Sequence, residues 1–292
     1  METDSKKTLL IVPPNDEEAY LIAELGEKKG FQVYRSAQPH GARLEREPRV
    51  LQLVKASGAS TVIVVELPGP EVEEQILAMG KHLVLIDHHN YADLERAYAP
   101  DGSVLPSSLE QFLKVADIND AHLRRWGYEP DLVRGIGLWD ANYLWGVLDA
   151  GYSKDRVEAV VTFKDQLAEK AGSAEADPVN QEEAQRAFDD REKFGDYFVV
   201  VSRHPSARIR SSLSRLFATT YWKRTPTIIS ERSGERIYVQ ETDRAKDLFH
   251  QFGGFTFGSD CNWGYDNETE TDQVSLSDVK SYLASPPNLG GE

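Results

Sequence analysis

The sequence is poor in the features that mark secreted and membrane proteins. It has a single cysteine, Cys261, so no disulfide can form within the chain, and a cytoplasmic setting is expected. No apolar run approaches the ~20 residues that cross a bilayer, so we expect no contact with a membrane. The opening METDSKKTLLIVPP has no long apolar segment behind a basic head, so no secretory signal is expected there.

Positive charge is also scarce. Lys and Arg number 33 against 48 Asp and Glu, which gives a formal net charge of −15. Such a field repels phosphates and argues against indiscriminate binding to long nucleic acid, although a local basic patch could overcome it. The 292 residues, 40% hydrophobic and 28% charged, are typical of a globular protein and long enough for two domains.

The first half of the chain alternates short apolar runs with helical patterns. The predicted strands are residues 8–14, 31–37, 60–70 and 82–89, and the predicted helices between them are residues 17–29, 49–57 and 71–80. Strands separated by helices of this length indicate an α/β domain with a mainly parallel sheet covered on both faces. Ligands of such sheets bind beyond the carboxyl ends of the strands.

The second half changes character twice. From Ser107 the pattern is helical, so the first domain is expected to span residues 1–165. Residues 166–195 are polar, acidic and poor in β-branched side chains, which predicts a linker with some helix near 181–193. Residues 196–292 begin with an apolar strand and continue with short strands near 225–230 and 235–240 and a helix at 244–254, followed by a glycine-rich stretch. This pattern predicts a smaller α+β domain.

Acids and histidines follow three of the predicted strands. Asp16 and Glu18 follow the first, Glu66 the third, and the tripeptide Asp87-His88-His89 the fourth. Parallel neighbours would bring these groups to one rim, where the carboxylates repel one another unless a cation neutralises them. Mixed carboxylate and imidazole ligands suit Mn²⁺, Fe²⁺ or a similar ion. The alternative is structural, because acids favour helix starts and Glu66 precedes a proline turn.

Asp140 is a separate case. It lies within GLWDANYLW, on a helix predicted to be largely buried. An ionised carboxylate there costs several kcal/mol unless it is paired or binds metal. An exposed position on the helix is the alternative.

In this order the motifs resemble the DHH phosphoesterase superfamily, which includes nanoRNases and single-strand exonucleases. The resemblance rests on IDHH at 86–89, on VVELPG around Glu66, on Ser107-Ser108-Leu109-Glu110 and on Asp140. It covers about residues 8–165 well and the rest more loosely. It implies a metal-dependent phosphodiesterase acting on short single-stranded RNA or DNA or on small nucleotides.

The resemblance also implies residue roles and two positions for Mn²⁺ or Mg²⁺ ions, one tight and one weak. Val12 replaces the family's histidine, so the position built on Asp16 and Glu66 is expected to be weak. The tight position is expected at Glu18, Glu66, His88 and Asp140. The catalytic residues implied are Asp87, His88 and His89, and the substrate contacts implied are His89, Ser107 and Ser108.

The C-terminal part resembles the family's DHHA1 domain. Gly253 and Gly254 keep part of its phosphate-binding GGGH turn, and Phe255 stands where the histidine would be. Between Asp196 and Glu231 there is no acid. This basic segment predicts phosphate contacts by Arg208 and Arg210, with base stacking on its aromatic residues Phe217, Tyr221 and Trp222. The alternative is a solvated helix whose Leu213, Leu216 and Phe217 lie in the core.

Two functions therefore stand open. The first is a metal-dependent phosphodiesterase, favoured by the presence of Asp87, His88, His89 and Asp140. The second is a non-catalytic DHH-like protein that binds nucleic acid or a protein, favoured by Val12 and by Phe255 in place of histidine. A homodimer is compatible with either.

Overall fold

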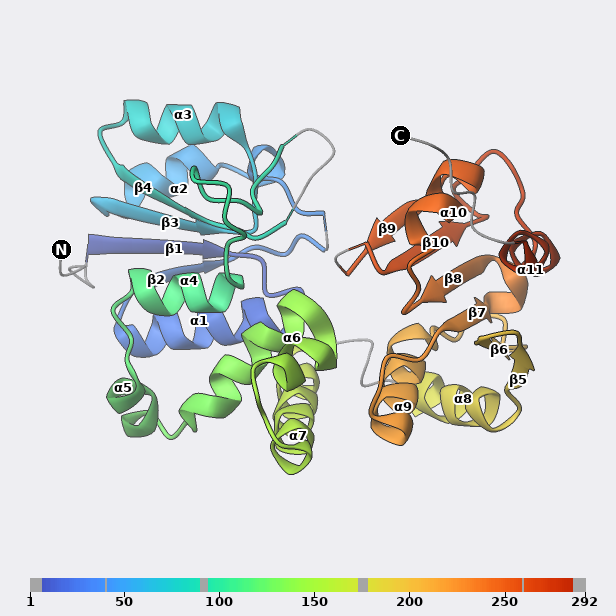
Figure 1. The fold of residues 1–292 in the computed structure, drawn as a ribbon. Helices are drawn as coiled ribbons and strands as arrows, with labels where there is room; N and C mark the ends of the chain where they lie inside the picture. Colours follow the sequence, from blue (N-terminus) through green and yellow to red (C-terminus); the bar gives the residue numbers. More distant parts are fainter. Residues whose placement is uncertain (1–6, 40, 90–93, 173–177, 259, 286–292) are drawn as a thin grey trace. The chain divides into compact units, whose positions relative to one another are not determined.

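The computed structural model describes residues 7–39, 41–89, 94–172, 178–258 and 260–285 (Figure 1). The chain divides into two compact units, residues 1–173 and residues 174–292. Each unit has its own sheet, with helices on both faces.

The sheet of the first unit is wholly parallel. Its strands are β1 (Thr8–Val12), β2 (Gln32–Arg35), β3 (Thr61–Val65) and β4 (His82–Ile86), in the order β2-β1-β3-β4. The central strands TLLIV and TVIVV are buried at every position, as strands covered on both faces must be. The predicted parallel α/β domain is confirmed.

Helices on both faces of this sheet bury its side chains. The helices α1 (Glu17–Lys29) and α4 (Ser108–Val115) lie on one face, and α2 (Val50–Ala56) and α3 (Pro70–Ala78) on the other (Figure 1). A short 3₁₀ helix, η2 (Leu44–Arg46), precedes α2. The remaining helices are α5 (Asp120–Arg125), α6 (Pro130–Asp149) and α7 (Lys154–Ala171). Within α6 the backbone leaves helical geometry at Asn142 and Tyr143, just after Asp140.

The second unit is the predicted α+β domain. Its strands are β5 (Glu192–Phe194), β6 (Tyr197–Val201), β7 (Thr227–Glu231), β8 (Arg236–Gln240), β9 (Phe255–Phe257) and β10 (Asn262–Asp266). They lie in the order β5-β6-β7-β8-β10-β9, and only the β6–β7 pair is parallel. One hydrophobic cluster joins the sheet to α8 (Pro178–Asp189) and α9 (Arg210–Tyr221), and another joins it to α10 (Ala245–Phe252) and α11 (Leu276–Ala284). A short 3₁₀ helix, η4 (Arg232–Gly234), links β7 to β8.

The structure corrects the predicted linker. Residues 166–171 complete α7, and most of the rest forms α8 and β5. The helix expected near residues 181–193 is present within α8. It is not part of a linker, because Ala184, Ala187 and Phe188 form a narrow apolar stripe that packs in the core of the second unit. The glycine-rich stretch also holds two strands, β9 and β10, that its composition concealed.

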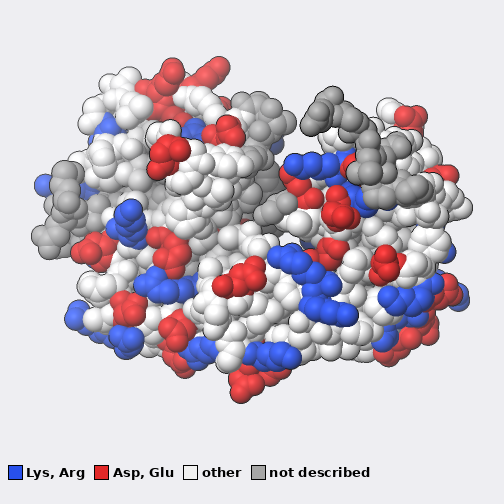
Figure 2. Space-filling model, viewed as in Figure 1, with Lys and Arg blue, Asp and Glu red and all other residues white. Residues whose placement is uncertain are grey.

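No helix in the described part of the chain is long and apolar enough to cross a membrane. On the face drawn in Figure 2, acidic and basic side chains are interspersed over the surface. The net charge of −15 is therefore not gathered into a single patch on that face.

Candidate metal centre

Four predicted ligands meet at the carboxyl rim of the parallel sheet. Glu66 directly follows β3, and His88 lies two residues beyond β4. Glu18 comes from the first turn of α1, and Asp140 comes from α6. One ligand atom from each of these side chains lies within 4.8 Å of the others. The structure thus brings together the set that the sequence assigned to a tight metal position.

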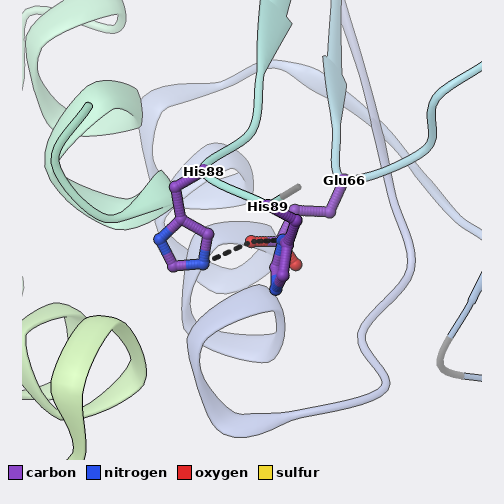
Figure 3. A group of neighbouring side chains, drawn as sticks. All are labelled: Glu66, His88 and His89. Carbon is purple, nitrogen blue, oxygen red and sulfur yellow. Dashed lines mark ion pairs between the residues drawn. The ribbon is translucent and has the colours of Figure 1, made fainter. Parts of the chain in front are cut away.

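His88 is the central contact of this group. Its Nε2 lies 3.0 Å from Asp140 Oδ2 and 3.7 Å from Glu66 Oε1. Figure 3 shows the side chains of Glu66, His88 and His89 directed toward one another from the ends of neighbouring strands. The backbone of Glu66 adopts a left-handed conformation, with φ 51°. That conformation is costly for a residue with a Cβ, and strain of this kind is often found at functional sites.

Glu18 is buried and has a hydrogen-bond partner on only one of its carboxylate oxygens. Its Oε1 accepts a hydrogen bond of 2.9 Å from the backbone N–H of Leu109, at the start of α4. Its other oxygen, Oε2, is buried and has no hydrogen-bond partner among the described residues, and the same is true of Glu66 Oε1. Unsatisfied buried carboxylate oxygens are rare, and each calls for a ligand. These two oxygens fit a divalent cation.

The electrostatics support the same conclusion. Burial raises the pKa of Glu18 well above its usual value, and the charges of Asp140 and Glu66 raise it further. Burial and Asp140 likewise raise the pKa of Glu66. Burial would also raise the pKa of Asp140, but its hydrogen bond to His88 holds it below the usual value. A cation would relieve the repulsion among the three carboxylates.

Asp140 is less buried than its sequence context predicted. Its side chain is 29% exposed, whereas that of His88 is 8% exposed. The helix α6 buries Trp139 and Leu144 but leaves Asp140 at the border between the core and solvent. The structure therefore agrees with the exposed alternative for this side chain, although the carboxylate still reaches His88.

Asp87 and His89 form a second pair beside the four ligands. Asp87 is buried, and its Oδ1 contacts His89 Nδ1 at 3.1 Å and accepts the backbone N–H of His89 at 3.0 Å. Partial burial alone would lower the pKa of His89, but the hydrogen bond to Asp87 and the charge of Glu66 raise it to about 9. The side chain of His89 is 48% exposed. The pair therefore presents a fixed, cationic imidazole to solvent.

Asp16 is placed differently from the four ligands. Its Oδ1 caps α1 by accepting the backbone N–H of Ala19 at 2.8 Å, which is the structural role of a helix-start acid. Among the described residues it belongs neither to the group of four nor to a second group of potential metal ligands, Glu66, His88 and His89. Val12 is fully buried at the end of β1 and offers no ligand atom. A weak first metal position built on Asp16 and Glu66 stays a prediction.

Ser107 and Ser108 lie buried at the start of α4, next to the centre. Ser107 caps α4 by accepting the backbone N–H of Glu110, and both Ser107 and Ser108 are buried. Neither hydroxyl is open to solvent, so the substrate contact implied for them by family resemblance does not follow from their placement. Their position instead fixes the start of α4, whose Leu109 N–H holds Glu18.

Gly137 in α6 is a site residue that the sequence reasoning missed. A Cβ at Gly137 would lie 2.3 Å from Ser107 Oγ and 3.4 Å from Glu18 Oε1. Its absence lets α6 approach α1 and α4 closely enough for Asp140 to reach His88. The only sequence signal is the unusual pair of glycines, 135 and 137, inside a helix.

Gly137→Ala is therefore expected to weaken Mn²⁺ binding by about tenfold or more, since misplacing a ligand by a few tenths of an ångström degrades a metal site. Gly135→Ala is the matched control, because its Cβ would meet Val160 of α7 instead, at 2.4 Å from Cγ2. Both variants should lose stability through overpacking. Calorimetric titration with Mn²⁺ measures the difference, and equal affinities in the two variants would contradict this role of Gly137.

The basic segment of the second unit divides into two kinds of residue. Phe217 is buried, and Tyr221 stacks on Phe198 with ring centroids 5.4 Å apart. Phe217 therefore lies in the core, as the structural alternative expected, and the partly buried Tyr221 packs against the same core cluster. Arg208 is exposed, and Arg210 begins α9.

Gly253 and Gly254 both adopt left-handed backbone conformations, with φ 79°, where α10 turns into β9.

Comparison of the whole fold identifies the architecture. A crystal structure of exonuclease RecJ bound to manganese superposes with a TM-score of 0.50 at 13% identity, covering 98% of this chain and 92% of that one. The chain has the fold of this exonuclease. At this identity the likeness establishes the fold and not the activity.

Two other solved structures superpose with lower scores. RecJ from Thermus thermophilus in complex with Mg²⁺ gives a TM-score of 0.41 at 11% identity, covering 98% of this chain and 51% of that one. The DHH domain of a protein described as a member of a family of ribosomal proteins gives a TM-score of 0.41 at 13% identity, covering 85% and 79%. No family model and no curated protein matches the sequence.

Proposed function

We propose that this protein is a metal-dependent phosphodiesterase that hydrolyses short single-stranded oligonucleotides or small nucleotides. The observation that carries the proposal is the group Glu18, Glu66, His88 and Asp140, in which two buried carboxylate oxygens lack hydrogen-bond partners within the part of the chain that the structure describes. Such a donor set suits Mn²⁺ or Mg²⁺. The RecJ-like fold supports a nuclease-type substrate.

The residues of the centre have different roles in this proposal. When bound, a divalent cation supplies Lewis-acid activation of water and neutralises phosphoryl charge. His88 and the three carboxylates would hold the tight ion, and Asp16 with Glu66 would contribute to a weaker one. Asp87 orients the imidazole of His89. With a pKa of about 9 in the free protein, His89 is protonated at neutral pH and can neutralise a phosphate oxygen of the substrate.

The test is hydrolysis by the purified protein. Labelled di- to pentanucleotides, the nucleotide 3′,5′-bisphosphate pAp and cyclic dinucleotides are incubated with Mn²⁺, Mg²⁺ or EDTA. Cleavage that depends on the metal and is abolished by EDTA is expected. Absence of cleavage with every substrate and metal would overturn the proposal. It would favour a non-catalytic binding protein, the second candidate, which the buried Val12 and the capping role of Asp16 support.

Arg208 is proposed to contact substrate phosphates. It is exposed, and no ion pair involves it among the described residues. Arg208→Ala should weaken oligonucleotide binding and reduce the slope of log Kd against log salt by about one. Arg224 is the control, because its guanidinium already pairs with Glu241 at 2.9 Å. An unchanged slope in the Arg208 variant would assign that side chain to a solvated face.

Two further expectations belong to the same proposal. A cytoplasmic location is supported by the single cysteine. A homodimer is proposed from the family resemblance alone, and light scattering in solution tests it.

A further inference from the structure

An aromatic cluster lies on one face of the second unit's sheet, on the strands β8 and β9. Tyr238, Phe255 and Phe257 form it, with ring centroids 5.9 to 6.5 Å apart. Tyr238 is buried, whereas Phe255 is 46% exposed. Phe255 is therefore the member that offers ring surface to solvent. Large apolar side chains this exposed need an explanation when they form part of a cluster.

Gly264 of β10 fixes the position of Phe255. It pairs with both Phe255 and Tyr238 across the sheet, so all three lie in one cross-strand row. A Cβ at Gly264 would lie 2.6 Å from Cζ of Phe255 and 3.0 Å from Cδ1 of Tyr238. The missing side chain lets the phenyl ring lie over the backbone of β10. Phe255 is thus held in place by the sheet, and little conformational freedom remains to be lost on binding a flat partner.

A cation borders the same rings. The guanidinium of Arg210 lies 5.1 Å from the ring centroid of Phe257 and 5.6 Å from that of Tyr238. The backbone N–H groups of Ile209 and Arg210 donate to the buried carboxylate of Glu231 at 2.7 and 3.2 Å, which anchors the start of α9 beside the cluster. The planar guanidinium therefore extends the aromatic surface with positive charge.

We propose that Phe255, Phe257, Tyr238 and Arg210 form a stacking platform for an unpaired nucleobase of a single-stranded oligonucleotide. An exposed, immobilised aromatic ring bordered by arginine is the combination that single-strand binders use. The acid-free stretch between Asp196 and Glu231, which includes Arg208 and Arg210, makes this part of a strongly acidic chain complementary to phosphate. A second copy of the chain, with its net charge of −15, lacks that complementarity.

The platform adds a base-binding site to the proposed function. It rests on that function only for the choice of a single-stranded oligonucleotide as the substrate. It also relocates the stacking surface, because Phe217 and Tyr221 of the basic segment are used in the core. If a base stacks on Phe255, the affinity for an oligonucleotide depends on whether that oligonucleotide carries bases. If the turn at Gly253 and Gly254 binds phosphate instead, the affinity depends on the sugar-phosphate backbone alone.

The experiment measures binding without catalysis. Fluorescence anisotropy with the full chain in EDTA compares a labelled pentanucleotide with an abasic phosphodiester of the same length. The wild type is expected to prefer the base-bearing probe by about tenfold or more, as one stacked base provides. Phe255→Ala should remove that preference and leave affinity for the abasic probe unchanged, and Phe255→Trp should retain it.

Phe249 provides the matched control. It is 44% exposed on α10 and is not part of the cluster, so Phe249→Ala should bind both probes as the wild type does. Equal loss in the two alanine variants, or unchanged preference in Phe255→Ala, would overturn the platform. So would a dimer in light scattering that Phe255→Ala dissociates. Absence of metal-dependent hydrolysis, with the base preference intact, would instead overturn only the proposed catalysis.

Discussion

His88→Ala is expected to abolish binding of the tight divalent ion and, with it, metal-dependent hydrolysis. The imidazole is the only nitrogen ligand of the four and contacts two of the three carboxylates, Asp140 at 3.0 Å and Glu66 at 3.7 Å. Its loss leaves the carboxylates, which repel one another, without the imidazole that contacts two of them. The affinity for Mn²⁺ should fall by more than about 100-fold, beyond the 10- to 100-fold typical of an outer-shell residue.

The control for this variant lies on the same strand. His82 begins β4, at the opposite end from the rim, and is exposed. His82→Ala should bind Mn²⁺ as the wild type does in calorimetric titration and should retain activity. If the His88→Ala variant keeps a tight ion, the centre is held by other residues, and the assignment of His88 is wrong.

Glu18→Gln is expected to stabilise the metal-free protein while weakening the metal site. The amide oxygen can still accept the N–H of Leu109, and the amide group can donate to the neighbouring carboxylates. Replacing a buried charge among like charges by a neutral group should raise the free energy of unfolding by about 2 kcal/mol in EDTA. In excess Mn²⁺ the order should reverse, because a ligand at 100 times its Kd adds about 2.7 kcal/mol to the wild type.

Glu47→Gln is a control variant for which the opposite change in the free energy of unfolding is expected. It is also buried, but its carboxylate accepts hydrogen bonds from Tyr34, Ser36 and Gln38, which hold its pKa below the usual value despite burial. Glu47→Gln should therefore destabilise the protein with or without Mn²⁺. Chemical denaturation measures all three proteins. If Glu18→Gln destabilises the metal-free protein as Glu47→Gln does, the carboxylates of the centre are not in repulsion.

The same groups set a pH dependence in EDTA. The pKa values of Asp16, Glu18 and Glu66 are all raised, chiefly by burial. Groups of this kind bind protons more readily in the folded state, so the wild type should gain stability as the pH falls from 7 toward 4.5, the ordinary value for glutamate. The lowered pKa of Asp140 acts only below this window, since its stabilisation is lost as the pH falls through its depressed value. The gain should be smaller in Glu18→Gln, and an equal gain would contradict the shift assigned to Glu18.

The positions of much of the centre could be predicted because several of its residues directly follow the carboxyl ends of parallel strands. The period of apolar residues locates β1, β3 and β4, and parallel order brings Glu66 and His88 to one rim whatever the side-chain details. The placement of Asp140 also followed from its motif. The choice between a buried and an exposed Asp140 did not follow, because the sequence shows the apolar neighbours in α6 but not which of them face α1 and α4.

The sequence by itself determined the strands and helices of the first sheet, their parallel arrangement and the identity of the rim residues, because hydrophobic period and turn residues act over short distances. Tertiary structure alone decided which atoms are left without partners. Glu18 has one satisfied oxygen because Leu109, 91 positions away, supplies an N–H, and Phe255 is held over β10 because Gly264 faces it across the sheet. Such contacts depend on the pairing of distant segments, where burial and register override local preference.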